Sequence, residues 1–143
     1  MDIMPYITTT ITFIIYVILI YACYTDLMYR KIKNRCVILA LIASLCLSIS
    51  YGDVNILAPT LFLIVGYIFT ITGCIGAGDI KLIVALLVGI PDILIYPFFI
   101  MTCIQGIPLA LICLMFSIFV IKSNFRTVPF GIAIAIGYIS VTI

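Results

Sequence analysis

Uninterrupted apolar runs constrain this chain more than any other feature of its sequence. Between residues 80 and 121 only two side chains, Lys81 and Asp92, carry a charge. Of all 143 residues, 66% are hydrophobic and 8% are charged, with a mean hydropathy of +1.47. A water-soluble domain carries about 25% charged residues. The chain lacks the polar surface that a soluble fold needs, so we predict an integral membrane protein.

Helices fit this pattern better than a transmembrane β-barrel does. Only α-helices and closed barrels satisfy all backbone hydrogen bonds inside a bilayer. Barrel strands alternate polar and apolar residues, whereas the runs here are continuously apolar. We therefore predict an all-α polytopic membrane protein. The polar stretches are too short to form a soluble domain, so residues 1–143 are expected to form a single transmembrane domain.

Polar breaks divide the chain into about six predicted transmembrane helices, each near the roughly 20 residues that span a bilayer. They cover residues 6–25, 36–51, 56–75, a pair of spans between 80 and 121, and residues 128–143. Within that pair we place the turn at residues 89–92, where Gly and Pro interrupt the run. A turn at residues 105–106 is the alternative.

The distribution of basic residues predicts the orientation of the chain. All seven Lys and Arg residues follow the first, third or fifth span, and four of them are Arg30, Lys31, Lys33 and Arg35. Loops rich in Lys and Arg remain on the cytoplasmic side of a membrane. We therefore expect these loops in the cytoplasm and both termini outside. The first residues lack the features of a secretory signal, so the first span is expected to remain in the protein.

Missing residue types exclude several chemistries. The chain has no His, and all five of its acidic residues are Asp. Ser-His and Cys-His nucleophile pairs and H-E-x-x-H zinc centres are therefore excluded. The six cysteines include no C-x-x-C pair, so we interpret them as core or lipid-facing residues. We predict neither a metal nor a cofactor, and a net charge of +2 does not suggest nucleic acid.

Two of the five aspartates occupy positions that suggest chemistry. Asp2 is terminal, and Asp53 and Asp92 stand beside Gly or Pro, where Asp is an ordinary turn former. Asp26 closes the first predicted span, and Asp79 opens the fourth. The number of spans between them places both at the cytoplasmic side at similar depth. We hypothesise that these two carboxylates form one catalytic pair.

Such a pair has a specific chemistry. Two carboxylates in one site do not both ionise easily, so they share a proton. The ionised member takes a proton from water as the water attacks an amide carbonyl, and the neutral member hydrogen-bonds the developing oxyanion. Gly76 and Gly78 would allow the backbone to approach closely beside Asp79. The reaction requires no metal.

Structural interpretations of the same residues stay open. Asp79 is also suited to cap the N-terminus of the fourth helix. Asp26 is close enough in sequence to pair with Arg30 or Arg35 at the membrane surface. Lys81 is more readily explained by reaching toward the lipid headgroups than by catalysis. The basic residues of the first loop are equally suited to hold anionic lipid.

Three elements of the sequence resemble a known family. Residues 76–79, Gly-Ala-Gly-Asp, followed by Ile-Lys-Leu, resemble the G-x-G-D motif of the prepilin peptidases, aspartic endopeptidases of bacterial type IV pilus systems. Asp26 with Ile32-Lys33-Asn34 is similar to the D-x-x-x-x-x-I-P-N pattern of that family. Residues 128–135, V-P-F-G-I-A-I-A, resemble the start of the last helix in short members that serve Tad (Flp) pili. The resemblance covers nearly the whole chain.

The resemblance implies the GxGD aspartic protease fold, with Asp26 and Asp79 as the catalytic pair and Gly76, Gly78 and Lys81 as supporting motif residues. It implies type IV (Flp/Tad-like) prepilins or pseudopilins as substrates, cut after a short basic leader at the cytoplasmic face of the bacterial inner membrane. Pilus-assembly machinery is a further implied partner.

The sequence departs from the family pattern in two respects. Lys33 stands where the family usually has Pro, which predicts a less rigid loop after Asp26. Longer members carry a cytoplasmic domain with two C-x-x-C pairs, and many also methylate the new N-terminus. This chain has neither that domain nor those cysteines, so we expect no methyltransferase activity.

Other functions remain open at this stage. In a transporter or channel subunit, Asp79 and Lys81 would line an ion path, although few other polar residues are available to extend it. A non-enzymatic scaffold of a pilus machine would keep its function after an Asp→Asn change. A Ser-Lys peptidase built on Lys81 has no serine nearby in sequence.

Overall fold

The computed structural model describes residues 4–29, 31–52, 54–73, 75–116 and 130–143. These residues form six helices: α1 (Met4–Tyr29), α2 (Asn34–Tyr51), α3 (Leu57–Ile71), α4 (Ala77–Leu87), α5 (Asp92–Phe116) and α6 (Gly131–Thr142). The predicted all-helical fold is therefore confirmed. The predicted loop at 122–126, the turn residue Asp53 and the predicted start of the last span at 128 lie outside the described residues.

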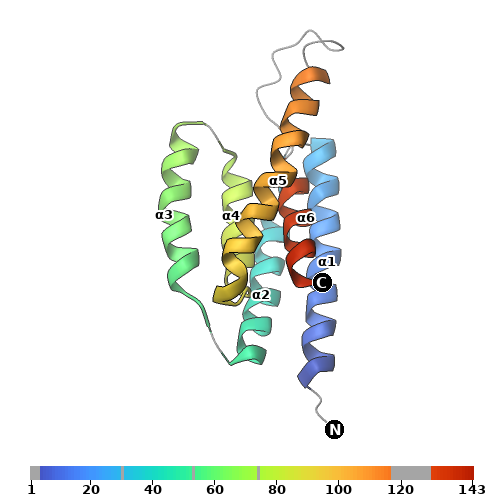
Figure 1. The fold of residues 1–143 in the computed structure, drawn as a ribbon, viewed down its shortest axis with the longest axis vertical. Coiled ribbons are helices and arrows are strands. Elements are labelled where there is room, and N and C mark those ends of the chain that lie inside the picture. Colours follow the sequence, from blue (N-terminus) through green and yellow to red (C-terminus); the bar gives the residue numbers. More distant parts are fainter. Residues whose placement is uncertain (1–3, 30, 53, 74, 117–129) are drawn as a thin grey trace.

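Successive helices run in opposite directions, as Figure 1 shows. The C-terminal end of α1 and the N-terminal ends of α4 and α6 therefore lie at the same end of the bundle, at the top of the view. Both chain termini lie toward the other end. This alternation positions the candidate site, because residues far apart in sequence are brought to one end.

Helix α4 forms the centre of the bundle. Six of its eleven residues are buried: Ile80, Leu82, Ile83, Ala85, Leu86 and Leu87. It packs against α2, α3 and α6. A transmembrane helix usually needs about 20 residues, but a helix enclosed by other helices does not itself have to match the lipid thickness.

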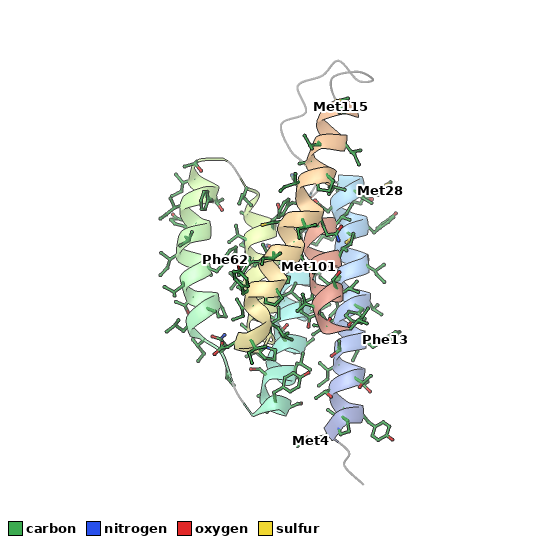
Figure 2. The ribbon with its side chains drawn as sticks, in the orientation of Figure 1. Met4, Phe13, Met28, Phe62, Met101 and Met115 are labelled. Atoms are coloured by element: carbon green, nitrogen blue, oxygen red, sulfur yellow. The ribbon has the colours of Figure 1, made fainter. Side chains whose placement is uncertain are left out.

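The outer helices carry the apolar surface expected of a membrane protein. Among the described residues, α1, α2 and the Asp92–Ile112 part of α5 are long and apolar enough to span a bilayer, and α3 and α6 are shorter apolar helices. Phe13 and Met28 of α1 are exposed and point away from the bundle (Figure 2). Phe62 of α3 instead faces inward and packs against Phe99 of α5, with 5.1 Å between the ring centres.

Glycines allow the helices to approach one another closely. A Cβ atom at Gly66 of α3 would lie 2.5 Å from Cγ2 of Ile80 in α4. Gly137 of α6 lies in the same way against the side chain and backbone of Thr102 in α5. Small residues at helix contacts are typical of membrane bundles, where close packing replaces the hydrophobic driving force.

The turn between the fourth and fifth helices lies where we first predicted it. Helix α4 ends at Leu87, and α5 begins at Asp92. The alternative turn at 105–106 is wrong, because α5 continues through these residues. Gly106 is explained by packing instead, since a Cβ atom there would lie 2.7 Å from the ring of Phe130.

Candidate active site

Asp26 lies in the last turns of α1 and is buried, with 6% of its surface exposed. Its Oδ2 atom accepts a hydrogen bond of 2.9 Å from the backbone N–H of Gly131. Gly131 is the first residue of α6, so the carboxylate lies at the positive end of that helix. A Cβ atom at position 131 would lie 2.8 Å from Oδ2, so glycine is required for this contact.

Asp79 lies in the first turn of α4 and is half-buried. The helix is capped by Gly76, whose carbonyl oxygen accepts the N–H groups of Asp79 at 3.1 Å and Ile80 at 3.3 Å. The N-cap residue is Gly76, and the Asp79 carboxylate accepts a hydrogen bond from the Gly76 backbone N–H, so Asp79 does help to cap the start of α4. A Cβ atom at Gly76 would lie 2.9 Å from Oδ2 of Asp79, so this glycine leaves room for the carboxylate.

The fold brings Asp26 and Asp79 to the same end of the bundle, from helices that are not adjacent in sequence (Figure 1). The two side chains are close enough for the charge of Asp26 to act on Asp79. We call the region formed by these two aspartates, the C-terminal end of α1 and the N-terminal ends of α4 and α6 the carboxylate end.

The loop after α1 contacts the glycine-rich motif directly. A Cβ atom at Gly78 would lie 3.2 Å from Cβ of Ile32. Ile32 itself is partly buried against the hydrophobic core. Two of the sequence patterns singled out above, one following Asp26 and one preceding Asp79, therefore pack against each other in the structure.

Lys81 differs from the other motif residues in its surroundings. It is exposed on α4, two residues beyond Asp79. Side chains two residues apart project from different sides of a helix. Its placement therefore fits a lysine that reaches outward and does not suggest contact with the Asp79 carboxylate.

Gly131 is a site residue whose contact with Asp26 could not be recognised from the sequence. The stretch at 128–135 was noted only as a family-like pattern, and its contact with Asp26 spans more than 100 residues of chain. Cys23, one helical turn before Asp26, also faces this point, with its Sγ atom 3.7 Å from the Gly131 carbonyl oxygen. A Pro-Phe-Gly sequence before an apolar run is a helix-start signal, but it does not say what that helix start contacts.

The chemistry available at the carboxylate end is that of two acids beside a helix start. Within the described part of the chain, no three His, Cys, Asp or Glu side chains gather in a group that could hold a metal ion.

Comparison with known proteins identifies the class of this chain. The model of the type IV leader peptidase family matches residues 13–119, a range that includes both Asp26 and Asp79. No curated protein and no solved structure matches the chain. The family match covers most of the sequence, so the chain belongs to the type IV leader peptidase family and is a protease of the prepilin peptidase kind. The resemblance to the prepilin peptidases is thereby confirmed, whereas the third motif, at residues 128–135, lies outside the matched range.

Proposed function

We propose that this protein is a membrane-embedded aspartic endopeptidase. It removes the short basic leader from type IV prepilins or pseudopilins of the Flp/Tad kind. Family membership supports cleavage of a leader peptide. The observation that carries the aspartic mechanism is the convergence of Asp26 and Asp79 at one end of the bundle.

The surroundings of the two aspartates support different roles. Asp26 accepts the Gly131 N–H at the start of α6, and both the hydrogen bond and the helix dipole favour a carboxylate in its ionised form. Asp26 is therefore the base that takes a proton from the attacking water. Asp79 also lies at a helix start and accepts the Gly76 N–H, but its burial and the charge of Asp26 disfavour its ionised form, so it is the member that carries the shared proton.

The two roles complete one hydrolysis. Water attacks the carbonyl carbon of the scissile peptide bond and gives a proton to Asp26. Asp79 donates its hydrogen bond to the carbonyl oxygen as negative charge develops there. The C–N bond then breaks, the leaving amine takes up the proton held by Asp26, and the aspartates return to their starting protonation.

We further propose how the enzyme sits in the bacterial inner membrane. The exposed basic residues Lys31, Lys33 and Arg35 adjoin the carboxylate end, which supports a cytoplasmic location for the site and outside positions for both termini. Residues 1–143 then act as one peptidase domain in contact with the pilus-assembly machinery. It cleaves without a cofactor and without methylating the new N-terminus.

The test is cleavage of a co-expressed pilin precursor by the wild type, Asp26→Asn and Asp79→Asn, with the membrane level of each protein measured by immunoblot. Asp92→Asn is the matched control, because it makes the same change at an aspartate of the other end. We expect cleavage by the wild type and the control only. Cleavage at the wild-type rate by either of the other variants would overturn the aspartic mechanism. Mass spectrometry of the mature pilin shows whether its N-terminus is methylated.

A further inference from the structure

Lys33 makes a set of contacts that is unusual for an exposed loop lysine. It precedes α2 in the loop of residues 31–33. Its Nζ atom donates a hydrogen bond of 3.3 Å to the hydroxyl of Tyr21. The same atom lies 5.8 Å from the centre of the Tyr29 ring, within range for cation–π attraction, and 5.7 Å from the centre of the Tyr21 ring whose hydroxyl it contacts.

These contacts tie the loop to the segment of α1 that carries Asp26. Tyr21 and Tyr29 are eight residues apart, slightly more than two helical turns, and Asp26 lies between them in sequence. A lysine ammonium on a flexible stem is ordinarily free to move in water. Here the side chain folds back onto α1 and fastens the loop to it.

Ile32, the residue before Lys33, connects the loop to the start of the helix that carries Asp79. Ile32 lies against Gly78, where an added Cβ atom would be 3.2 Å from Cβ of Ile32. Gly78 directly precedes Asp79 in the first turn of α4. A continuous set of contacts therefore leads from Lys33 through Ile32 and Gly78 to Asp79.

The backbone conformation of Lys33 allows a substitution that removes its side-chain contacts and keeps the shape of the loop. Its φ of −68° and ψ of 134° are values that proline adopts without strain. Its carbonyl oxygen accepts the Cys36 N–H at 2.9 Å, a bond that proline preserves because it retains the carbonyl. The loop that the sequence analysis expected to be less rigid is held here by a side chain.

We propose that Lys33 is a positioning residue of the peptidase. By clamping the loop of residues 31–33 onto α1, it holds Ile32 against Gly78 and fixes Asp79 relative to Asp26. This inference rests on the proposed aspartic mechanism. Lys33 acts through the loop and does not contact the substrate or the carboxylates.

The test compares Lys33→Ala with Lys33→Pro in the purified protein, using a synthetic precursor peptide that contains the leader and the first residues of the pilin. We expect Lys33→Ala to lower kcat about tenfold with KM nearly unchanged, because misplaced catalytic groups slow the chemical step. Lys33→Pro restores kcat to within about twofold of the wild type, because proline fixes φ at the observed value. Lys31→Ala, which removes a neighbouring exposed charge, leaves both constants unchanged.

Two results would overturn the proposal. If Lys33→Ala keeps the wild-type kcat, the contacts of the Lys33 amino group do not position the site. If KM rises while kcat stays constant, Lys33 binds substrate and does not position the site.

Hydrogen exchange on the same proteins separates this inference from the proposed function, because it requires no cleavage. Lys33→Ala is expected to speed amide exchange in both 31–33 and 76–79, and Lys33→Pro to leave both close to wild type. Unchanged exchange at 76–79 in Lys33→Ala would refute the positioning role even if the wild type cleaves. Failure of the wild type to cleave, with the expected exchange pattern, would refute the proposed function alone.

Discussion

Asp79 and Asp92 both lie near the start of a helix but have different surroundings. Each lies in the first turn of its helix, α4 and α5 respectively. Asp79 is half-buried and lies within electrostatic range of Asp26. Asp92 is exposed and accepts a hydrogen bond from the side-chain amide of Asn55. An acid at a helix start acquires its role from the group that the fold places opposite it.

The two ends of the bundle also differ in the groups that surround their aspartates. We call the turns at 54–56 and 88–91, with Asp92, the far end. Asn55 links its parts, since its Oδ1 atom also accepts the Ala58 N–H of α3 at 3.2 Å. A cavity of about 30 Å³ lies there, large enough for about one water molecule and lined by Ser48, Tyr51, Asn55, Gly89, Ile90, Pro91 and Asp92. At the far end, polar side chains connect neighbouring helices by hydrogen bonds. At the carboxylate end, two carboxylates lie near each other.

The largest expected effect comes from the same substitution at the two helix starts. Asp79→Asn is expected to lower the cleavage rate of the purified enzyme about 1,000-fold, within the usual range for loss of a catalytic acid or base. Asp92→Asn keeps an oxygen that accepts from Asn55 and is expected to stay within about twofold of the wild type. Equal cleavage rates for the two variants would contradict a catalytic role for Asp79 and a structural role for Asp92.

A pair of glycine substitutions sharpens the comparison further. In Gly131→Ala the new Cβ atom displaces the Asp26 carboxylate from its buried hydrogen bond, so we expect cleavage to slow about 10- to 100-fold and the unfolding midpoint to fall. Gly52 lies in the α2–α3 turn with a φ of 75° and open space around it. In Gly52→Ala the strained backbone is expected to cost about 1 kcal/mol of unfolding free energy and leave kcat unchanged.

The measurement for this pair is the thermal unfolding midpoint in detergent together with kcat. Loss of activity in Gly52→Ala at a temperature where it is fully folded would contradict the division between the two ends.

Removal of the link at the far end is expected to affect stability alone. Asn55→Ala loses the hydrogen bonds to Asp92 and to the Ala58 N–H, which is expected to lower the free energy of unfolding by about 1–2 kcal/mol. Chemical unfolding in detergent measures this loss, and cleavage at low temperature checks that kcat is retained. A tenfold fall in kcat would show that the far end acts on the site.

Lys81→Met is expected to have the smallest effect. Lys81 is exposed and projects from a different side of α4 than Asp79, so its charge is expected to contribute to membrane anchoring more than to catalysis. The cleavage rate should stay within about twofold of the wild type. A loss comparable to that of Asp79→Asn would instead support a catalytic lysine.

The helices could largely be predicted from the sequence because apolar composition and helix-breaking residues determine them locally. The turn at 89–92 was found by its Gly and Pro residues. The lengths of the helices were harder to predict. Helix α3 ends at Ile71, before the predicted end at 75, and the chain turns at Gly73 with a φ of 75°. An apolar run looks the same in sequence whether it faces lipid or, as in α4, other helices.

The site could be predicted only where the number of spans determines position. Alternation of the helices, which Figure 1 shows, was enough to place the C-terminal end of α1, with Asp26, and the N-terminal end of α4, with Asp79, at one end. The contact of Gly131 with Asp26 and the contacts of Lys33 with two tyrosines depend on distances between side chains in the folded protein. No local pattern encodes these distances, so the sequence suggested neither contact.

The measurement that tests the central claim most directly is the cleavage rate of the Asp26→Asn/Asp79→Asn double variant, compared with each single variant in the purified enzyme. Residues that act as one catalytic unit lose their effect together, so the account predicts that the double variant is no slower than either single variant. Two separate contributions of about 1,000-fold would instead multiply to about a millionfold. A double variant that is slower by that product, or a single variant that retains the wild-type rate, would contradict the account.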